Sequence, residues 1–171
     1  MAEVRPNPGH LALKELEDFL AENFMLITQN IDGLHEEAGN RRILEMHGSL
    51  RSCFCTKCGK TFHMTEVDLE PAIPLCPDCG TALRPDIVWF GEIPYHMNEI
   101  DLILRNADYF IVVGTSGMVQ PAASLVYLAR MHGAKTIGVN LAPPENMIFI
   151  DEFHQGKSGE MLPVLVKKWI R

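Results

Sequence analysis

The fold of this chain is decided by one stretch of its sequence, Tyr109-Phe110-Ile111-Val112-Val113-Gly114-Thr115-Ser116. The first five residues are apolar and rich in β-branched and aromatic types, which predicts a strongly apolar strand. A helix is predicted to follow over residues 121–131, so the glycine and the two hydroxyl residues are expected at the carboxyl edge of a parallel sheet. Open α/β folds bind nucleotides at this edge, although an ordinary strand-to-helix turn would use the same residues.

Strands and helices alternate along most of the remaining chain. Asn7-Pro8 has the pattern of an N-cap followed by a proline at the first helical position, which predicts a helix over residues 8–22. Further helices are predicted over residues 98–106 and 160–170, a short helical turn before Gly39, and strands over residues 24–28, 43–46, 87–90 and 136–139. This alternation predicts parallel βαβ units. The periodicity disappears over residues 48–83, which indicates a separate module.

Composition and charge exclude several classes of protein. The 171 residues are 47% hydrophobic and 22% charged, which suits one globular domain carrying a small module and not a disordered tail. No apolar run approaches the ~20 residues of a membrane span, and the start of the chain lacks the layout of a secretion signal, so a soluble cytoplasmic protein is expected. The formal charge is −7 and no dense stripe of Lys and Arg occurs, so neither nucleic acid nor a membrane is expected as a partner.

The cysteines carry the most specific chemical signal. Four of the five form two Cys-x2-Cys pairs separated by seventeen residues: Cys55, Cys58, Cys76 and Cys79. This is the spacing of a four-thiolate zinc site, and four protein ligands leave no position for water, so one structural Zn²⁺ is predicted. A pair of redox dithiols is the alternative. Cys53 and His63 fit the paired geometry less well and are expected to stay outside the site.

Short motifs follow one another along the whole chain. They are Thr28-Gln29-Asn30-Ile31-Asp32-Gly33-Leu34-His35, Ala38-Gly39, His47-Gly48, Val88-Trp89-Phe90-Gly91-Glu92, Gly114-Thr115-Ser116 with Val119 and Pro121-Ala122, Asn140-Leu141, Gly156 with Gly159, and Leu162-Pro163. Their combination resembles the sirtuin family of NAD-dependent protein deacylases. Arg84-Pro85, ahead of Trp89, is most similar to the bacterial and mitochondrial class known for removing acidic acyl groups.

The resemblance implies NAD as co-substrate and acylated-lysine proteins or peptides as partners. His47 matches the catalytic general base that acts on a ribose hydroxyl, a role that suits imidazole because it is largely neutral at physiological pH. The residues implied in cofactor binding are Gln29, Asn30 and Asp32 at the nicotinamide ribose, and Gly114, Thr115, Ser116, Asn140 and Ser158 at the adenosine half. Those implied in binding an acyl-lysine peptide as an added strand are Val88, Phe90, Gly91 and Glu92.

Simpler interpretations stay open. Asp32 could cap a short helix, and an isolated histidine before a glycine is more often a surface or core residue than a catalyst. Residues 88–92 could form a buried β-strand, and for Trp89 a core position is the favoured interpretation. For the chain as a whole, the alternative to an enzyme is a non-catalytic, zinc-stabilised module that binds peptides or a partner.

The resemblance also implies a piece that this sequence does not contain. Sirtuins open with a strand and a glycine-rich Gly-Ala-Gly-x-Ser loop that covers the NAD diphosphate, and Met1 falls after both. We therefore expect an α/β fold: a Rossmann-like parallel sheet lacking its first strand, formed by residues 1–47 and 84–171, with a zinc-ribbon module inserted at 48–83. Because unpaired strand edges are costly and the loop supplies backbone donors, this chain alone is expected to be marginally stable and weakly active or inactive.

Overall fold

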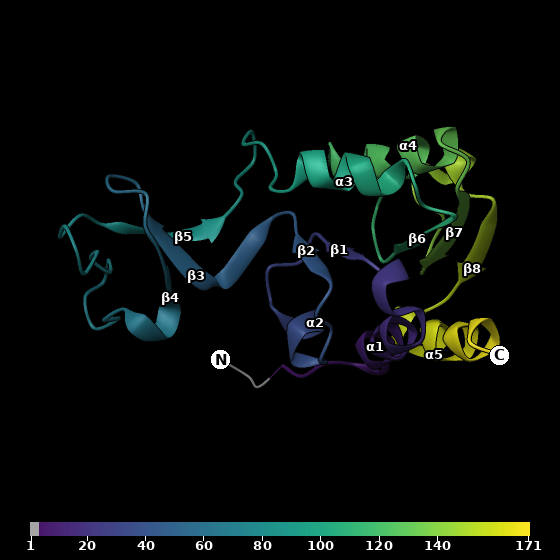
Figure 1. Cartoon of the computed structure of the whole chain (residues 1–171), viewed down its shortest axis with the longest axis horizontal. Helices are drawn as coiled ribbons and strands as arrows, with labels where there is room; N and C mark the ends of the chain where they lie inside the picture. The colour runs from purple at the N-terminus through teal and green to yellow at the C-terminus, as the bar shows by residue number, and fades with distance from the viewer. Residues whose placement is uncertain (1–3) are drawn as a thin grey trace. The chain divides into compact units, whose positions relative to one another are not determined.

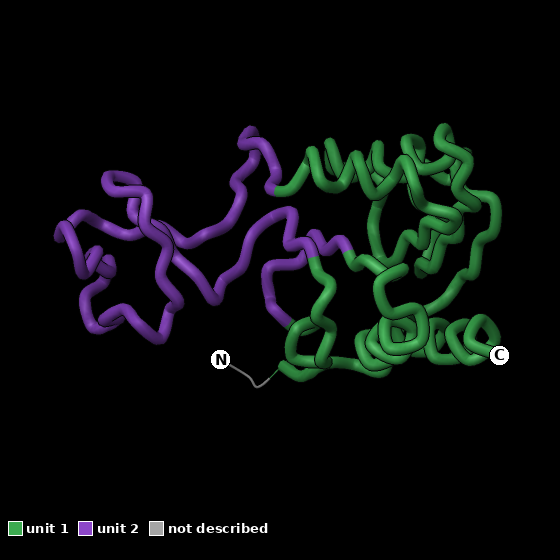
Figure 2. Tube along the Cα trace, viewed as in Figure 1, with its two compact units in different colours: residues 1–26, 34–43, 96–171 green, residues 27–33, 44–95 purple. Residues whose placement is uncertain are grey.

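The computed structural model describes residues 4–171 and divides into two compact units (Figure 2). Unit 1 contains the residues up to 26 together with 34–43 and 96–171, and unit 2 contains residues 27–33 and 44–95. The first three residues of the predicted segment 1–47 lie outside the described residues.

Unit 1 is built on a parallel three-stranded sheet with the order β6-β7-β8 (Figure 1). Its strands are β6 (Tyr109–Val113), β7 (Lys135–Asn140) and β8 (Glu152–Gln155). Ile111 pairs with Ile137, which pairs in turn with Glu152. The strands predicted at β6 and β7 are confirmed, and the parallel pairing confirms the predicted α/β class.

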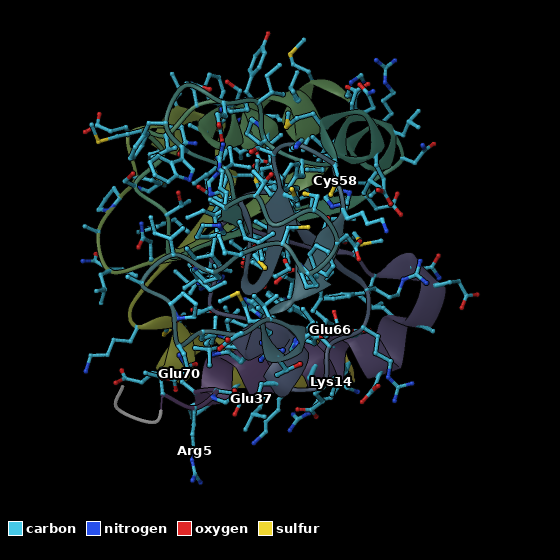
Figure 3. The ribbon with its side chains drawn as sticks, turned by 90° about the vertical axis from the view of Figure 1, so that its left-hand side faces the viewer. Arg5, Lys14, Glu37, Cys58, Glu66 and Glu70 are labelled. Atoms are coloured by element: carbon cyan, nitrogen blue, oxygen red, sulfur yellow. The ribbon has the colours of Figure 1, made fainter. Side chains whose placement is uncertain are left out.

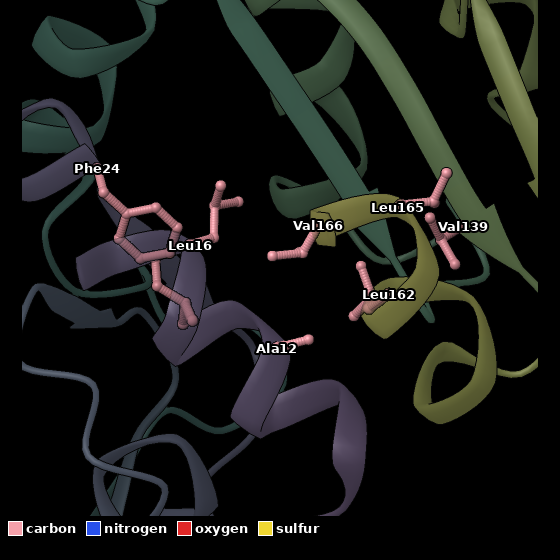
Figure 4. Close-up of a cluster of buried hydrophobic side chains, with 8 residues drawn as sticks. Ala12, Leu16, Phe24, Val139, Leu162, Leu165 and Val166 are labelled. Atoms are coloured by element: carbon pink, nitrogen blue, oxygen red, sulfur yellow. The ribbon is translucent and has the colours of Figure 1, made fainter. Parts of the chain in front are cut away.

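Helices cover both faces of this sheet. α3 (Met97–Leu104) and α4 (Leu125–Met131) lie on one side, and α1 (Pro8–Leu20) and α5 (Ser158–Trp169) lie on the other (Figure 1). The buried cluster on the second side consists of Ala12, Leu16, Phe24, Leu26, Val139, Leu162, Leu165 and Val166 (Figure 4). Burying one Leu or Val side chain stabilises a fold by roughly 1.5–3 kcal/mol, so this cluster fixes α1 and α5 against β7. None of the helices within residues 4–171 is long and apolar enough to cross a bilayer.

Helix α1 begins where the sequence predicts. The Asn7 side-chain oxygen accepts hydrogen bonds from the backbone N–H groups of Gly9 (2.8 Å) and His10 (3.4 Å) in the first turn of the helix. The helix ends at Leu20 and is followed by the 3-10 turn η1 (Ala21–Asn23). The helix predicted over 121–131 is divided between the 3-10 turn η3 (Ala122–Ser124) and α4.

Unit 2 is built on an antiparallel three-stranded sheet with the order β4-β3-β5. β3 (Gly48–Cys55) lies between β4 (Thr61–His63) and β5 (Leu83–Ile87), and its pairing with β5 shifts register between Ser49 and Cys53. The buried core consists of Cys53, Cys55, Val67, Cys76 and Leu83. A core this small needs a further stabilising element, such as a bound metal.

Two short strands lie where the chain passes between the units. β1 (Leu26–Thr28) pairs with β2 (Ile43–Glu45), and the short helix α2 (Leu34–Glu37) separates them in the sequence. These elements confirm the strands predicted over residues 24–28 and 43–46 and the helical turn predicted before Gly39.

Some local predictions are wrong. β5 ends at Ile87, so no strand covers residues 88–90, and Trp89 is 58% exposed, which contradicts the favoured core position. The physical reason is a tight turn in this segment, held by side chains that pattern analysis does not reveal. β8 was not predicted because its sequence is mostly polar, and β3 was not predicted because the cysteine pattern masks its alternation.

Candidate functional site

The four paired cysteines of unit 2 form one cluster. The sulfur atoms of Cys55, Cys58, Cys76 and Cys79 all lie within 4.8 Å of one another, with 3.4 Å between those of Cys55 and Cys79 and 3.7 Å between those of Cys58 and Cys76. Four thiolates placed ~2.3 Å from one Zn²⁺ at the corners of a tetrahedron lie roughly 3.8 Å apart. The cluster therefore fits one four-coordinate structural zinc ion, as the spacing predicts.

Both cysteine pairs are presented by the same kind of turn. The N–H of Gly59 donates to the Cys55 carbonyl at 2.9 Å, and the N–H of Gly80 donates to the Cys76 carbonyl at the same distance. The φ angles of Gly59 and Gly80 are 73° and 69°, a region that side chains disfavour. These matched turns aim all four sulfurs at one point.

The thiols of the cluster influence one another's ionisation. Hydrogen bonds with the side chain and backbone of Thr81 lower the pKa of Cys79 to about 6. For the exposed Cys58 (Figure 3), the Lys60 backbone lowers the pKa, but desolvation and the neighbouring thiols outweigh it and raise the pKa to about 11. A divalent cation favours the thiolate form of every ligand.

The two residues expected to stay outside this cluster do so. Cys53 is buried in the core of unit 2, where its sulfur lies 3.7 Å from the Phe62 carbonyl and burial raises its pKa. The His63 ring lies 2.7 Å from the Thr65 hydroxyl and caps the 3-10 turn η2 (Met64–Glu66).

The predicted catalytic histidine lies beside the predicted nicotinamide-ribose residues, all in unit 2. The Nδ1 atom of His47 lies 2.9 Å from the backbone carbonyl oxygen of Gln29. A carbonyl can only accept, so Nδ1 carries the ring proton and Nε2 has the lone pair. His47 is partly buried. This arrangement allows Nε2 to accept a proton.

Hydrogen bonds hold residues 28–33 next to the segment that carries His47. The N–H of Leu50 donates to the Ile31 carbonyl at 3.0 Å, and the N–H of Asn30 donates to the Thr28 hydroxyl at 3.1 Å. The predicted ribose-pocket residues and the histidine therefore share one hydrogen-bonded framework.

Gly48 permits a close approach of two strands beside the histidine. Its φ is 78°, and a Cβ added there would lie 2.1 Å from the Asp86 carbonyl oxygen. Gly48 pairs with Ile87, and the next N–H, that of Val88, donates to the His47 carbonyl at 2.9 Å. The predicted peptide-binding segment therefore starts at the backbone of His47.

In unit 1, the predicted adenosine residues gather at the carboxyl ends of the parallel strands. Gly114, with φ of 62°, follows β6, and its N–H donates to the Val139 carbonyl at 3.0 Å. Asn140 ends β7; its Nδ2 donates to the Thr115 carbonyl at 2.7 Å, and its Oδ1 accepts from the Leu141 N–H at 2.9 Å. The Asn140 side chain thus braces the loop that follows β6.

The third strand end completes this edge of unit 1. The N–H of Gly156, just after β8, donates to the Asn140 carbonyl at 2.9 Å, and Ser158 begins α5 two residues later. Ser116 accepts a hydrogen bond at its hydroxyl from Met118 N–H (3.3 Å). Unit 1 therefore brings together all the predicted adenosine-half residues, and unit 2 brings together the histidine and the ribose-pocket residues.

The predicted peptide-binding residues form a turn. The N–H of Glu92 donates to the Trp89 carbonyl at 3.0 Å, Gly91 has φ of 92°, and Phe90 is 100% exposed. Arg84 donates two hydrogen bonds to the Glu92 carboxylate, at 2.7 and 2.5 Å, and Trp89 N–H donates a third at 2.9 Å. The hydrogen bonds from Arg84, and to a lesser extent the one from Trp89, lower the pKa of Glu92 to about 2. The sequence places Arg84 in a motif with Pro85 but does not reveal this contact with Glu92.

Comparison with known proteins decides the family. The family model described as "Sir2 family" matches residues 1–121, which is well over half of the chain. The chain belongs to the Sir2 family.

Curated Sir2 relatives match almost the whole chain. A protein of Salmonella typhimurium named "NAD-dependent protein deacylase" is 43% identical over 169 residues, covering 99% of this chain and 62% of its own length. A protein of the same name from Escherichia coli K12 is 42% identical over 170 residues, covering 99% and 61%. The chain thus spans about three fifths of the length of these relatives.

Solved Sir2 structures share the fold. A Sir2 homologue in complex with NAD is 38% identical with a TM-score of 0.90, covering 99% of this chain and 68% of that one. A complex titled "Sir2-p53 peptide-NAD+" is 30% identical with a TM-score of 0.87, covering 98% and 71%. A Sir2 protein bound to a myristoylated histone peptide is 40% identical with a TM-score of 0.83, covering 96% and 72%.

Proposed function

We propose that this Sir2 chain serves the NAD-dependent removal of acyl groups from lysine side chains. In the overall reaction, acyl-lysine, NAD and water yield lysine, O-acyl-ADP-ribose and nicotinamide. The observation that carries the proposal is the hydrogen bond between His47 Nδ1 and the Gln29 carbonyl, because it leaves Nε2 able to accept a proton. The names of the Salmonella and Escherichia relatives support the same activity.

Residues of unit 2 would act on the reacting groups. NAD, when bound, supplies a sugar carbon from which nicotinamide departs. His47 Nε2 would take the proton from a ribose hydroxyl of bound NAD, which would make that oxygen a better nucleophile. Asn30 can donate to and accept from the ribose, and Asp32 can accept from the carboxamide of nicotinamide. Gln29 positions the histidine through its carbonyl.

Residues of unit 1 would bind the adenosine half of NAD. The positive φ of Gly114 allows close backbone approach, and the hydroxyls of Thr115 and Ser116 can bond ribose or phosphate oxygens. Asn140 and Ser158 lie at neighbouring strand ends of the same edge, where open α/β folds bind nucleotides. We assign Asn140 to the ribose and Ser158 to the adenine.

The peptide would lie along the segment that follows β5. Val88 and Phe90 are assigned to the lysine side chain, and Gly91 and Glu92 to the peptide backbone. The bond from Val88 N–H to the His47 carbonyl supports this assignment, because it places the segment beside the histidine. The peptide complexes of other Sir2 proteins support an acylated peptide as partner.

The domain assignment follows the chemistry of the sites. We assign residues 48–83 to the zinc-binding domain and residues 1–47 and 84–171 to the NAD-binding domain. Cysteines stay reduced in the cytosol, so four cysteines used as metal ligands support a cytoplasmic location.

Nicotinamide release tests the proposal. This chain, and a form extended at its amino end with a glycine-rich NAD loop, are incubated with NAD and an acetyl-lysine peptide. We expect nicotinamide and O-acetyl-ADP-ribose in equal amounts from the extended form. Peptide binding that NAD does not change, with no nicotinamide from either form, would instead indicate a non-catalytic binding module.

A further inference from the structure

Arg84 is the centre of a side-chain network around the exposed turn Trp89–Glu92. Its guanidinium donates to both carboxylate oxygens of Glu92, and Nη2 also donates to the Ile87 carbonyl at 3.0 Å. The guanidinium carbon lies 5.4 Å from the centre of the Phe54 ring and 5.2 Å from that of the Trp89 ring.

These contacts fix both ends of the turn. The two hydrogen bonds to the Glu92 carboxylate hold the last residue of the turn. The hydrogen bond to the Ile87 carbonyl holds the chain just before the turn, where β5 ends. A planar guanidinium can bond a carboxylate through two parallel donors while stacking on aromatic rings, and an ammonium group cannot. Exposed ion pairs are usually weak, but a bidentate pair between a guanidinium and a carboxylate is the favourable case.

The turn is connected to the histidine through the backbone. The residue after Ile87 is Val88, whose N–H donates to the His47 carbonyl at 2.9 Å. The order along the chain is therefore Arg84, the end of β5, the bond to His47, and then the exposed Phe90. A shift of the turn changes where a bound lysine side chain meets the imidazole.

We propose that Arg84 is a positioning residue for the acyl-lysine peptide: it holds the Trp89–Glu92 turn in the conformation that receives the peptide, and does not read the acyl group. This rests on the proposed function. Both terminal nitrogens of Arg84 are engaged by Glu92, so its positive charge is already neutralised inside unit 2. The Arg84-Pro85 motif therefore shapes the peptide site and does not select acidic acyl groups.

The experiment uses Trp89 as the reporter. The chain has two tryptophans, so W169F leaves Trp89 as the only tryptophan. Binding of acetyl-lysine and succinyl-lysine peptides of the same sequence is followed by Trp89 fluorescence in this background, with and without R84Q. Zinc content and NAD affinity are measured on the same samples. K60Q, which removes the exposed ion pair with Asp78 in the same unit, is the matched control.

We expect R84Q to weaken both peptides by the same factor, tenfold or more, and to change the Trp89 emission before any peptide is added. NAD affinity and zinc content stay unchanged, and K60Q behaves as the parent. R84K, which keeps the charge and loses the bidentate pair, is expected to resemble R84Q. If R84Q loses zinc, the same comparison is made with R84K.

Three results would overturn the inference. One is peptide binding by R84Q within twofold of the parent, and another is a loss confined to the succinyl peptide, which would make Arg84 an acyl reader. The third is a parent chain that binds neither peptide. Failure of the proposed function gives a different result from failure of this inference. If only the proposed function fails, no nicotinamide is released, but R84Q still weakens peptide binding.

Discussion

The Nδ1 atom of His47 lies 2.9 Å from the backbone carbonyl oxygen of Gln29, and this single contact fixes the tautomer of the ring. Because the acceptor is a main-chain atom, the contact depends on how residues 28–33 are held, and not on the side chain at position 29. The tautomer of the histidine is therefore set by the backbone geometry of residues 28–33.

Thr28 stabilises that backbone through its hydroxyl. The oxygen accepts the Asn30 N–H at 3.1 Å, and Thr28 is buried. T28V removes the acceptor and is expected to destabilise the fold by about 1 kcal/mol and to weaken NAD binding. T28S keeps the oxygen and should behave as the parent. Denaturant unfolding and NAD titration measure both effects; identical behaviour of T28V and T28S would count against this role.

A methyl group at position 48 should be poorly tolerated. The Cβ of G48A would lie 2.1 Å from the Asp86 carbonyl oxygen, at a φ of 78°. Because β3 and β5 would have to separate, we expect the free energy of unfolding to fall by at least about 3 kcal/mol. G133A is the control, because Gly133 has φ of 97° with open space around it, and should cost only about 1 kcal/mol. Thermal unfolding compares the two variants. If G48A and G133A lowered the free energy of unfolding equally, the contact between Gly48 and the Asp86 carbonyl would not be tight.

Metal analysis should find one zinc ion per chain. C58S and C76S each remove one ligand from the sulfur cluster and are expected to lose the metal and the structure of unit 2, whose core is small. C53A is the control, since Cys53 lies outside the ligand set, and it should retain one zinc. Zinc content and amide hydrogen exchange provide the readout. Retention of zinc by C76S, or its loss in C53A, would refute the assigned ligands.

The Trp89–Glu92 turn should loosen only in acid. The pKa of Glu92 is lowered from 4.5 to about 2, chiefly by the hydrogen bonds from Arg84. The folded state therefore binds fewer protons than the unfolded state below about pH 4.5, and the stabilisation, complete above that pH, is lost as the pH falls towards 2. In the W169F background, Trp89 emission should be constant from pH 7 to 5 and change between about 4.5 and 2. E92Q should lack this transition; a parent transition above pH 5 would contradict the ion pair.

The sequence predicts those parts of the molecule that depend on local pattern. Tyr109–Val113 is a strand because an unbroken apolar run suits a parallel sheet, and the two Cys-x2-Cys turns converge because each is a local structure. The contacts between Arg84, Trp89 and Glu92 depend on side chains that meet only in the folded chain. Periodicity therefore suggested a buried strand at Trp89, where the structure has an exposed turn.

The measurement that tests the central claim most directly compares His47 with H47A in the extended form, with NAD and an acetyl-lysine peptide present. A general base contributes roughly 10²–10⁴-fold, so H47A should retain peptide and NAD binding while O-acetyl-ADP-ribose formation falls by at least about 100-fold. Product formation by H47A within a few-fold of the parent would contradict the assignment of His47 Nε2 as the base.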